Sequence, residues 1–272
     1  MKILVTGSNG QLGSEIREIS SDYMLMNCFF TDLTDLDICD FAKLQSYIIK
    51  NNITTVINCA AYTDVDKAED DLEAAKEVNI YGVQNLVKAL KKVNGKLIHI
   101  STDYVFNGEN SIPYKESDIV SPIGVYGKTK RNGELAVINS DIDAIVIRTS
   151  WIYSCYGNNF FKTMIKLGTE KKSISVICDQ IGTPTYARDL AKTCLDILTK
   201  KKPLEISKNG KLYHYSNDGV VSWYDFSVAI MELGLIDCKI NPVLTKNYLT
   251  NSKRPLYSVL SKAKIKKDFN LE

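Results

Sequence analysis

The chain has 272 residues, 44% of them hydrophobic, which is enough to bury a large core as one α/β unit or two closely joined lobes. Its 34 basic and 32 acidic residues leave a formal net charge of +2, and this balance argues against nucleic acid as the main partner. No apolar run approaches the ~18 residues that a membrane-spanning helix needs, so no membrane insertion is expected.

Strand-like and helical patterns alternate through the first half of the chain. Strands are expected at residues 3–5, 24–30, 54–58, 97–101 and 145–149. Helices are expected from Gln11, after Asp40, and over residues 72–92, 128–138 and 187–198. Continuous apolar strands of this kind are typical of parallel strands covered by helices on both faces. The pattern predicts an α/β fold with a Rossmann-type, doubly wound parallel sheet.

The rhythm loosens after residue 150. Helices are expected at residues 158–171 and 223–233, strands at 174–177 and 213–216, and a polar tail with prolines follows. We expect a dinucleotide-binding domain over residues 1–150, with a helix at 187–200 packing back on it. Residues 151–272 then form mostly a smaller α/β substrate-binding lobe over the carboxyl ends of the strands, where ligands bind in such sheets.

The cysteines and histidines bear on compartment and metal binding. Seven cysteines without a C-x-x-C pair indicate reduced thiols rather than a disulfide frame or a zinc site. The first residues run directly into a strand and leave no room for a signal peptide, so a cytoplasmic protein is expected. With only two histidines, no metal site is expected.

A glycine motif, G-x-x-G-x-x-G, follows the first predicted strand. Gly7 permits the tight turn, Gly10 allows the backbone to approach a pyrophosphate, and Gly13 allows the helix to pack closely on the strand. The free N–H groups and the positive end of the helix dipole then face the phosphates. An ordinary glycine-rich turn is the alternative, but the position between a strand and a helix favours a dinucleotide site.

Asp32 lies near the end of the second predicted strand, 19 residues after Gly13. A carboxylate there accepts hydrogen bonds from adenosine ribose hydroxyls and repels a 2′-phosphate. No arginine stands beside it in the sequence, so the cofactor is expected to be NADH or NADPH with a lean toward NADH. A loop-start aspartate without a ligand is the alternative. Asp37 could meet the adenine edge or cap the following helix, and both remain open.

Tyr126 and Lys130 form a Y-x-x-x-K pattern. If it opens a helix, the two side chains lie on one face. We expect the Lys130 ammonium to lower the pKa of Tyr126, which makes the phenol a better general acid for a developing alkoxide. Lys130 can also hold a ribose hydroxyl of the cofactor.

Thr102 ends the fourth predicted strand, at the edge where a substrate carbonyl would lie. Its hydroxyl and that of Tyr126 could both donate to one oxygen and stabilise the charge that appears on reduction. The alternative is a hydroxyl that satisfies local backbone groups.

These segments together resemble the dTDP-4-dehydrorhamnose reductases, a group of the extended short-chain dehydrogenase/reductase family. The resemblance rests on residues 6–13, 58–69, 78–79, 101–106, 126–130, 148–153 and 179–185, with a late motif at 254–260. It implies hydride transfer from the nicotinamide to C4 of dTDP-6-deoxy-L-lyxo-4-hexulose, giving dTDP-L-rhamnose, while Tyr126 protonates the oxygen.

The resemblance also implies residue roles. The pyrophosphate is expected to meet Gly10, Gln11 and Leu12, and the adenosine to lie among Asp32, Asp37 and Ile38. The cofactor is expected to be lined further by Ala61, Tyr62 and Thr63. The sugar nucleotide is expected to contact Thr102, Asp103 and Trp151. An indole offers a flat apolar face to a deoxysugar, although Trp151 as core filler is the alternative.

One departure from the family concerns magnesium. Some relatives dimerise through magnesium held by glutamates, and Glu15 matches one such position. Arg188 stands where a second carboxylate is expected, so magnesium is doubtful here, and a homodimer stays open.

Three alternatives compete with this function. A sugar-nucleotide 4,6-dehydratase needs a glutamate after the Thr-Asp pair, where Tyr104 stands here. A reductase of a different nucleotide-linked 4-keto-deoxysugar is harder to distinguish. A non-catalytic, cofactor-binding subunit like the regulatory subunit of methionine adenosyltransferase is the third, and the intact Thr102, Tyr126 and Lys130 favour an enzyme over it.

Overall fold

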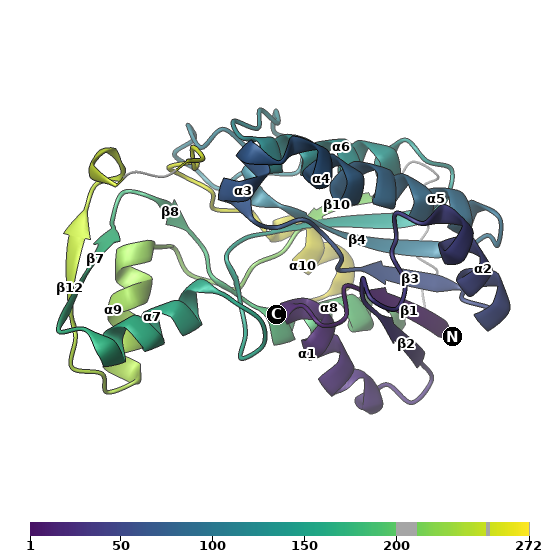
Figure 1. The fold of residues 1–272 in the computed structure, drawn as a ribbon, viewed down its shortest axis with the longest axis horizontal. Helices are drawn as coiled ribbons and strands as arrows, with labels where there is room; N and C mark the ends of the chain where they lie inside the picture. The colour runs from purple at the N-terminus through teal and green to yellow at the C-terminus, as the bar shows by residue number, and fades with distance from the viewer. Residues whose placement is uncertain (200–210, 249–250, 272) are drawn as a thin grey trace.

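The computed structural model describes residues 1–199, 211–248 and 251–271; residue 200, where the predicted helix 187–200 ends, lies outside them. Its centre is a six-stranded parallel sheet in the order β10-β5-β4-β3-β1-β2 (Figure 1). The strands are β1 (Lys2–Thr6), β2 (Asn27–Thr31), β3 (Thr55–Asn58), β4 (Lys96–Thr102), β5 (Asp143–Thr149) and β10 (Lys211–His214). This confirms the predicted α/β fold with a doubly wound parallel sheet.

The strand order reverses between β1 and β3. β1 pairs with β2 on one side and with β3 on the other, so the chain leaves this point in opposite directions. The loops that follow β1 and β3 therefore diverge and open a crevice at the carboxyl edge of the sheet, where ligands bind in this architecture.

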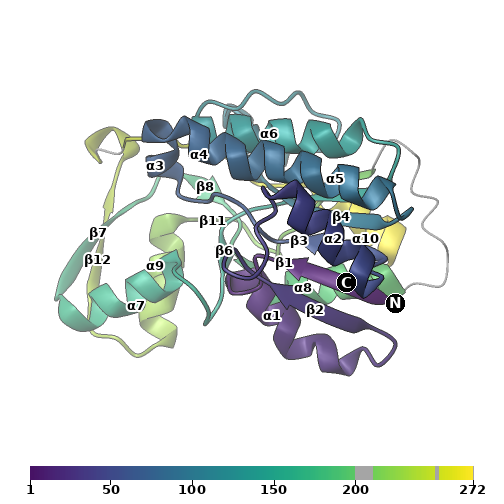
Figure 2. The same ribbon diagram turned by 45° about the vertical axis from the view of Figure 1, so that its right-hand side comes forward.

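Helices cover both faces of this sheet (Figure 2). Those against one face are α1 (Gln11–Ile19), α8 (Ala187–Thr199) and α10 (Ala263–Phe269), and those against the other are α2 (Phe41–Asn51), α5 (Val83–Lys91) and α6 (Val125–Ile138). Successive residues of β1 serve the two faces, because Ile3 and Val5 pack with α1 and α8 while Leu4 packs with α2 and α5. Helices therefore shield both faces of the sheet from water, as the apolar strands predict.

A smaller lobe projects beyond the carboxyl edge of the sheet (Figure 1). It contains α7 (Phe160–Glu170), α9 (Trp223–Leu233) and the parallel pair β7 (Ser173–Ile177) and β12 (Lys239–Val243). Two short pairs connect it to the main body: β6 (Ile152–Tyr153) with β9 (Thr185–Tyr186), and β8 (Ile181–Gly182) with β11 (Val221–Ser222). Met164, Val176, Ile230 and Ile240 lie in its own core.

Several elements differ from the sequence expectations. Met24 and Leu25 are 94% and 88% exposed in a turn, so the second strand begins only at Asn27. The helix expected at 72–92 is divided into α4 (Leu72–Lys76), a π-helical turn (Glu77–Gly82) and α5, and it is preceded by α3 (Val65–Asp70). The strand expected at 213–216 in the smaller lobe is β10, which pairs with β5 in the main sheet. Its apolar run has the same pattern in either place, so only the pairing distinguishes them.

Short 3-10 turns complete the element list: Ser20–Asp22, Asp103–Val105 and Thr245–Asn247. Within the described ranges, no helix has both the length and the apolar character required to cross a membrane.

Candidate active site

A cleft of about 890 Å³ lies at the carboxyl ends of β1, β3 and β4, between the sheet and the smaller lobe. It brings together residues from distant parts of the chain that the sequence analysis singled out. They are Gly7, Gly10, Gln11, Leu12, Asp32, Asp37, Ile38, Ala61, Tyr62, Thr63, Thr102, Asp103, Tyr126, Lys130 and Trp151. Gly13 does not line the cleft, because it lies against Ser8 inside the turn.

The glycine turn has the backbone geometry that the motif predicts. Gly7 has φ +63°, a left-handed conformation that favours glycine. A Cβ on Gly13 would lie 2.5 Å from the Cα of Ser8, so only glycine allows the helix to approach this closely. No side chain caps α1, whose N-cap is Gly10. The first N–H groups of α1 therefore remain available at the cleft, which fits a pyrophosphate.

Two aspartates lie at the far end of the cleft, after β2. The Asp32 carboxylate accepts hydrogen bonds from the backbone N–H groups of Asn9 and Leu33, both at 2.8 Å. Asp37 accepts one from the backbone N–H of Cys39 at 2.8 Å. The cap of α2 is instead Asp40, so the capping alternative for Asp37 is wrong.

The loop after β3 is fixed by an asparagine of the π-helical turn. Asn79 accepts a hydrogen bond from the Tyr62 backbone N–H at 2.9 Å and donates to the Tyr62 carbonyl at 3.1 Å. Its amide also donates to the Thr129 hydroxyl on α6 at 3.1 Å. One buried side chain thus holds the cleft wall at Tyr62 against the helix that carries Tyr126 and Lys130.

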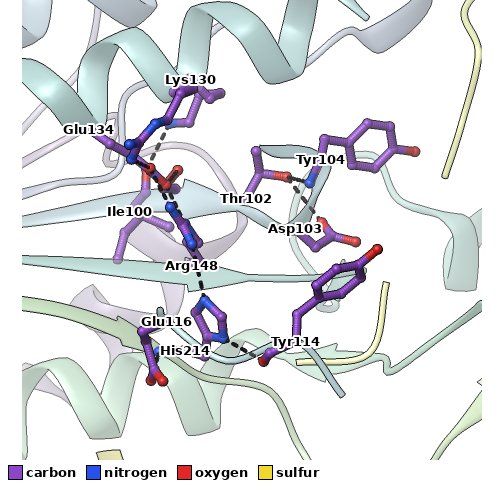
Figure 3. Close-up of polar contacts among 12 residues, drawn as sticks. Ile100, Thr102, Asp103, Tyr104, Tyr114, Glu116, Lys130, Glu134, Arg148 and His214 are labelled. Carbon is purple, nitrogen blue, oxygen red and sulfur yellow. Dashed lines mark hydrogen bonds and ion pairs between the residues drawn. The ribbon is translucent and has the colours of Figure 1, made fainter. Parts of the chain in front are cut away.

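Tyr126 and Lys130 both lie on α6, which begins at Val125, so the two side chains share one face as predicted. Lys130 is 3% exposed, and its Nζ donates to the Ile100 carbonyl oxygen at 2.7 Å (Figure 3). Burial lowers the pKa of Lys130 to about 8, against an opposing effect of Glu134. A lysine with this pKa gains or loses its proton near neutral pH.

The expected effect of Lys130 on Tyr126 is wrong for this structure. Burial raises the pKa of Tyr126 to about 12; a contact with the Thr102 hydroxyl opposes the shift and the Asp103 carboxyl adds to it. The physical reason is that desolvation disfavours the phenolate, while the Lys130 ammonium is directed to a backbone carbonyl. Tyr126 is therefore a phenol throughout the neutral range.

Thr102 and Asp103 form a buried pair at the end of β4. The Thr102 hydroxyl donates to Asp103 Oδ1 at 3.0 Å and accepts from the Tyr104 backbone N–H at 3.2 Å (Figure 3). Asp103 is 2% exposed, and its Oδ2 has no hydrogen-bond partner within the described part of the chain. Burial raises the pKa of Asp103 to about 6. Thr102 thus donates to the Asp103 carboxyl, which lies at the wall of the cleft.

Of the aromatic wall of the cleft, only Trp151 was predicted from the sequence. Trp151 stacks on Trp223 of the smaller lobe with ring centroids 3.5 Å apart and planes 9° apart. Phe160 packs on Trp223 from the start of α7, with centroids 4.4 Å apart. Trp151 has φ +48°, which is uncommon for a bulky residue. Trp223 and Phe160 line the cleft, and the only available signal was that Trp223 is the second tryptophan of the chain.

A loop between the two lobes, residues 154–159, was also missed. Asn159 donates a hydrogen bond to the Gln11 side chain at 2.9 Å, and Ser154 donates to buried Glu15 at 2.6 Å. The second carboxylate oxygen of Glu15 lies 3.6 Å from Arg188 Nε. The loop is thereby tied to the helix that follows the glycine turn.

Comparison with known proteins shows which families and enzymes this chain resembles. The model of the family described as RmlD substrate binding domain matches residues 1–272. A dTDP-4-dehydrorhamnose reductase of Aggregatibacter actinomycetemcomitans is 38% identical over 100% of this chain and 94% of that protein. The same enzyme of Escherichia coli strain K12 is 36% identical over 100% of this chain and 93% of its own length.

Solved structures give the same picture. A dTDP-4-dehydrorhamnose reductase of Clostridium acetobutylicum superposes with a TM-score of 0.90 at 41% identity, covering 96% of this chain and 90% of its own. That of Bacillus anthracis, in complex with NADP, has a TM-score of 0.92 at 35% identity, covering 98% and 92%. A dTDP-glucose 4,6-dehydratase of Streptomyces venezuelae is only 17% identical and shares the fold alone.

Proposed function

Since the chain belongs to the dTDP-4-dehydrorhamnose reductase family, we propose that its cleft reduces the C4 ketone of dTDP-6-deoxy-L-lyxo-4-hexulose to dTDP-L-rhamnose with NAD(P)H. The observation that carries this proposal is the convergence of Thr102, Tyr126 and Lys130 in one cleft with an uncapped helix end. An enzyme is favoured over a cofactor-binding subunit because the proton donor Tyr126 lies in this cleft together with Thr102 and Lys130.

Bound NAD(P)H supplies the hydride, and the chain's own residues handle the proton. Tyr126, whose pKa is about 12, holds its proton at neutral pH and gives it to the substrate oxygen, since an alkoxide is a far stronger base than a phenolate. Lys130 keeps a positive charge in the cleft below about pH 8, where it can hold a ribose hydroxyl of the cofactor.

The sugar nucleotide is held between polar and aromatic walls. Asp103, which lies at the wall of the cleft, accepts a hydrogen bond from a sugar hydroxyl. The face of Trp151, backed by Trp223, covers the apolar side of the deoxysugar. Thr102 keeps Asp103 in position through its hydroxyl.

The two lobes divide these tasks. We assign dinucleotide binding to residues 1–150 and sugar binding mostly to residues 151–272, with α8 packing on the main sheet. Arg188 lies beside Glu15 and would repel a magnesium ion there, so we propose that this glutamate does not bridge subunits through magnesium.

The test is nicotinamide absorbance with the purified chain and dTDP-6-deoxy-L-lyxo-4-hexulose. We expect NAD(P)H consumption that depends on the sugar nucleotide, with dTDP-L-rhamnose as the product. Tight cofactor binding without consumption would overturn the reductase in favour of a binding subunit. Consumption only with another 4-keto-deoxysugar nucleotide would overturn the assigned substrate.

A further inference from the structure

An arginine that was not predicted as a site residue lies next to the glycine turn, one residue away from the contact of that turn with Asp32. Arg17, near the end of α1, turns back over the glycine turn. Its terminal nitrogen donates to the Ser8 hydroxyl at 2.8 Å and makes a longer contact with the Asn9 side-chain oxygen at 3.4 Å. Ser8 is 1% exposed, so one contact of the guanidinium is anchored in the rigid turn.

Asn9 lies between this arginine and Asp32. Its backbone N–H donates to Asp32 at 2.8 Å, while its side chain faces Arg17. The carboxylate that is expected to accept ribose hydroxyls and the guanidinium therefore lie on either side of one residue. Arg17 and Asp32 are 15 positions apart in the sequence, and both contact Asn9 in the folded chain.

The guanidinium is oriented and its charge is uncompensated. Its central carbon lies 5.0 Å from the centroid of the Phe30 ring, close to the end of β2, so the ring supports one face of it. Among the residues that the structure describes, no carboxylate lies within 4.0 Å of Arg17. Arg17 is exposed, and its remaining donors are available to an anion.

We propose that Arg17, which the buried Ser8 hydroxyl holds in place, binds the 2′-phosphate of NADPH in this chain. The inference rests on the proposed function in so far as that function places the adenosine at Asp32. A ribose 2′-phosphate carries roughly −1.5 to −2 charges at neutral pH, which Asp32 alone would repel. A guanidinium can bind two of its oxygens at once and offsets that repulsion. The lean toward NADH rested on the lack of an arginine beside Asp32.

The experiment compares 2′,5′-ADP with ADP as calorimetric probes, because they differ in the 2′-phosphate and need no turnover. Arg17→Ala should weaken binding of 2′,5′-ADP by roughly ten- to a hundredfold and change ADP binding less than about twofold. Arg17→Lys should fall between, since it keeps the charge but loses the fork. Lys88→Ala, an exposed lysine on α5 at the opposite face of the sheet, is the charge-matched control and should change neither.

Equal losses for both probes, or none, would overturn the subsite. Steady-state kinetics then separate this inference from the reductase itself. If Arg17→Ala lowers kcat/KM with NADPH and leaves kcat/KM with NADH unchanged, both the 2′-phosphate subsite and the reductase function are supported. If 2′,5′-ADP binding depends on Arg17 but the keto sugar causes no cofactor consumption, the reductase fails and the subsite stands.

Discussion

Arg148 and Glu134 form a bidentate ion pair inside the protein, with Nε–Oε1 at 2.7 Å and a second contact to Oε2 at 2.8 Å. Their side chains are 1% and 0% exposed. Ser101 and Arg131 also donate to Glu134, so both carboxylate oxygens are satisfied. The pair joins β5 to α6 one helical turn after Lys130, and it therefore fixes the helix that carries the proposed proton donor.

Replacing Arg148 by methionine should destabilise the fold by about 3–5 kcal/mol, because it leaves a buried carboxylate without its main partner. Urea unfolding at neutral pH measures this. The double variant with Glu134→Leu should recover part of the loss, and a single-variant cost below about 1 kcal/mol would contradict the idea that the pair holds α6.

The same pair has a signature in acid. Burial opposes the charge of Glu134, but hydrogen bonds from Arg148 and Ser101 outweigh it and hold the pKa of Glu134 below its usual value. A depressed folded-state pKa contributes stability above the unfolded pKa and loses it as the pH falls. The difference in unfolding free energy between wild type and Arg148→Met should therefore shrink toward acid pH.

Tyr126→Phe should reduce turnover by roughly a hundred- to ten-thousandfold, because the ring remains while the proton donor is lost. Cofactor affinity, measured by nicotinamide fluorescence, should stay within about twofold. Tyr104→Phe is a suitable control, since its ring packs on Tyr126 at a centroid distance of 5.5 Å. Full activity of Tyr126→Phe would remove Tyr126 from the mechanism.

The rate of reduction should fall above about pH 8, because Lys130 loses its charge there while Tyr126 keeps its proton until about pH 12. This alkaline limb of the pH–rate profile belongs to Lys130, a cationic group whose pKa is lowered by burial. Activity is therefore present below that pKa and lost above it. The Lys130→Arg variant should reduce the substrate more slowly. Its activity should fall only at a higher pH, since arginine stays charged. An unchanged limb in that variant would assign it to another group.

Asp103 should produce the acid limb. Its pKa is about 6, so below that pH the carboxylate gains a proton and loses acceptor capacity toward Thr102 and the sugar. We expect kcat/KM for the sugar nucleotide to fall below about pH 6. Asp103→Asn should lower kcat/KM roughly ten- to a hundredfold at neutral pH and remove this limb. A limb that persists in Asp103→Asn would contradict the assignment.

The sequence predicted the parts of the site whose chemistry is local. The turn at Gly7 and the Tyr126–Lys130 spacing can be recognised because backbone sterics and the helical repeat impose them over a few residues. The pKa of Tyr126 could not be predicted, because it depends on how much water the folded cleft excludes and on where the Lys130 ammonium is directed.

Contacts across long sequence separations were also beyond reach. The position of Arg17 over the Phe30 ring depends on how α1 packs near β2, and the stacking of Trp223 on Trp151 depends on how the smaller lobe closes on the sheet. The place of β10 in the main sheet is of the same kind, since an apolar run does not specify its neighbour.

Gly182 lies against the Trp151 ring of the tryptophan stack. A Cβ there would lie 2.6 Å from two atoms of the Trp151 ring and 2.9 Å from the Ser258 hydroxyl. The Trp151 ring is rigid and Trp223 stacks on one of its faces, so Gly182→Ala must displace Trp151. The KM for the sugar nucleotide should rise roughly tenfold, while cofactor affinity stays unchanged. The chain has only two tryptophans, so its fluorescence reports on this stack directly. Gly95→Ala, whose Cβ would meet the flexible end of Leu90, is the matched control and should alter neither KM nor fluorescence. If Gly182→Ala left both unchanged, Trp151 would not be part of the sugar site.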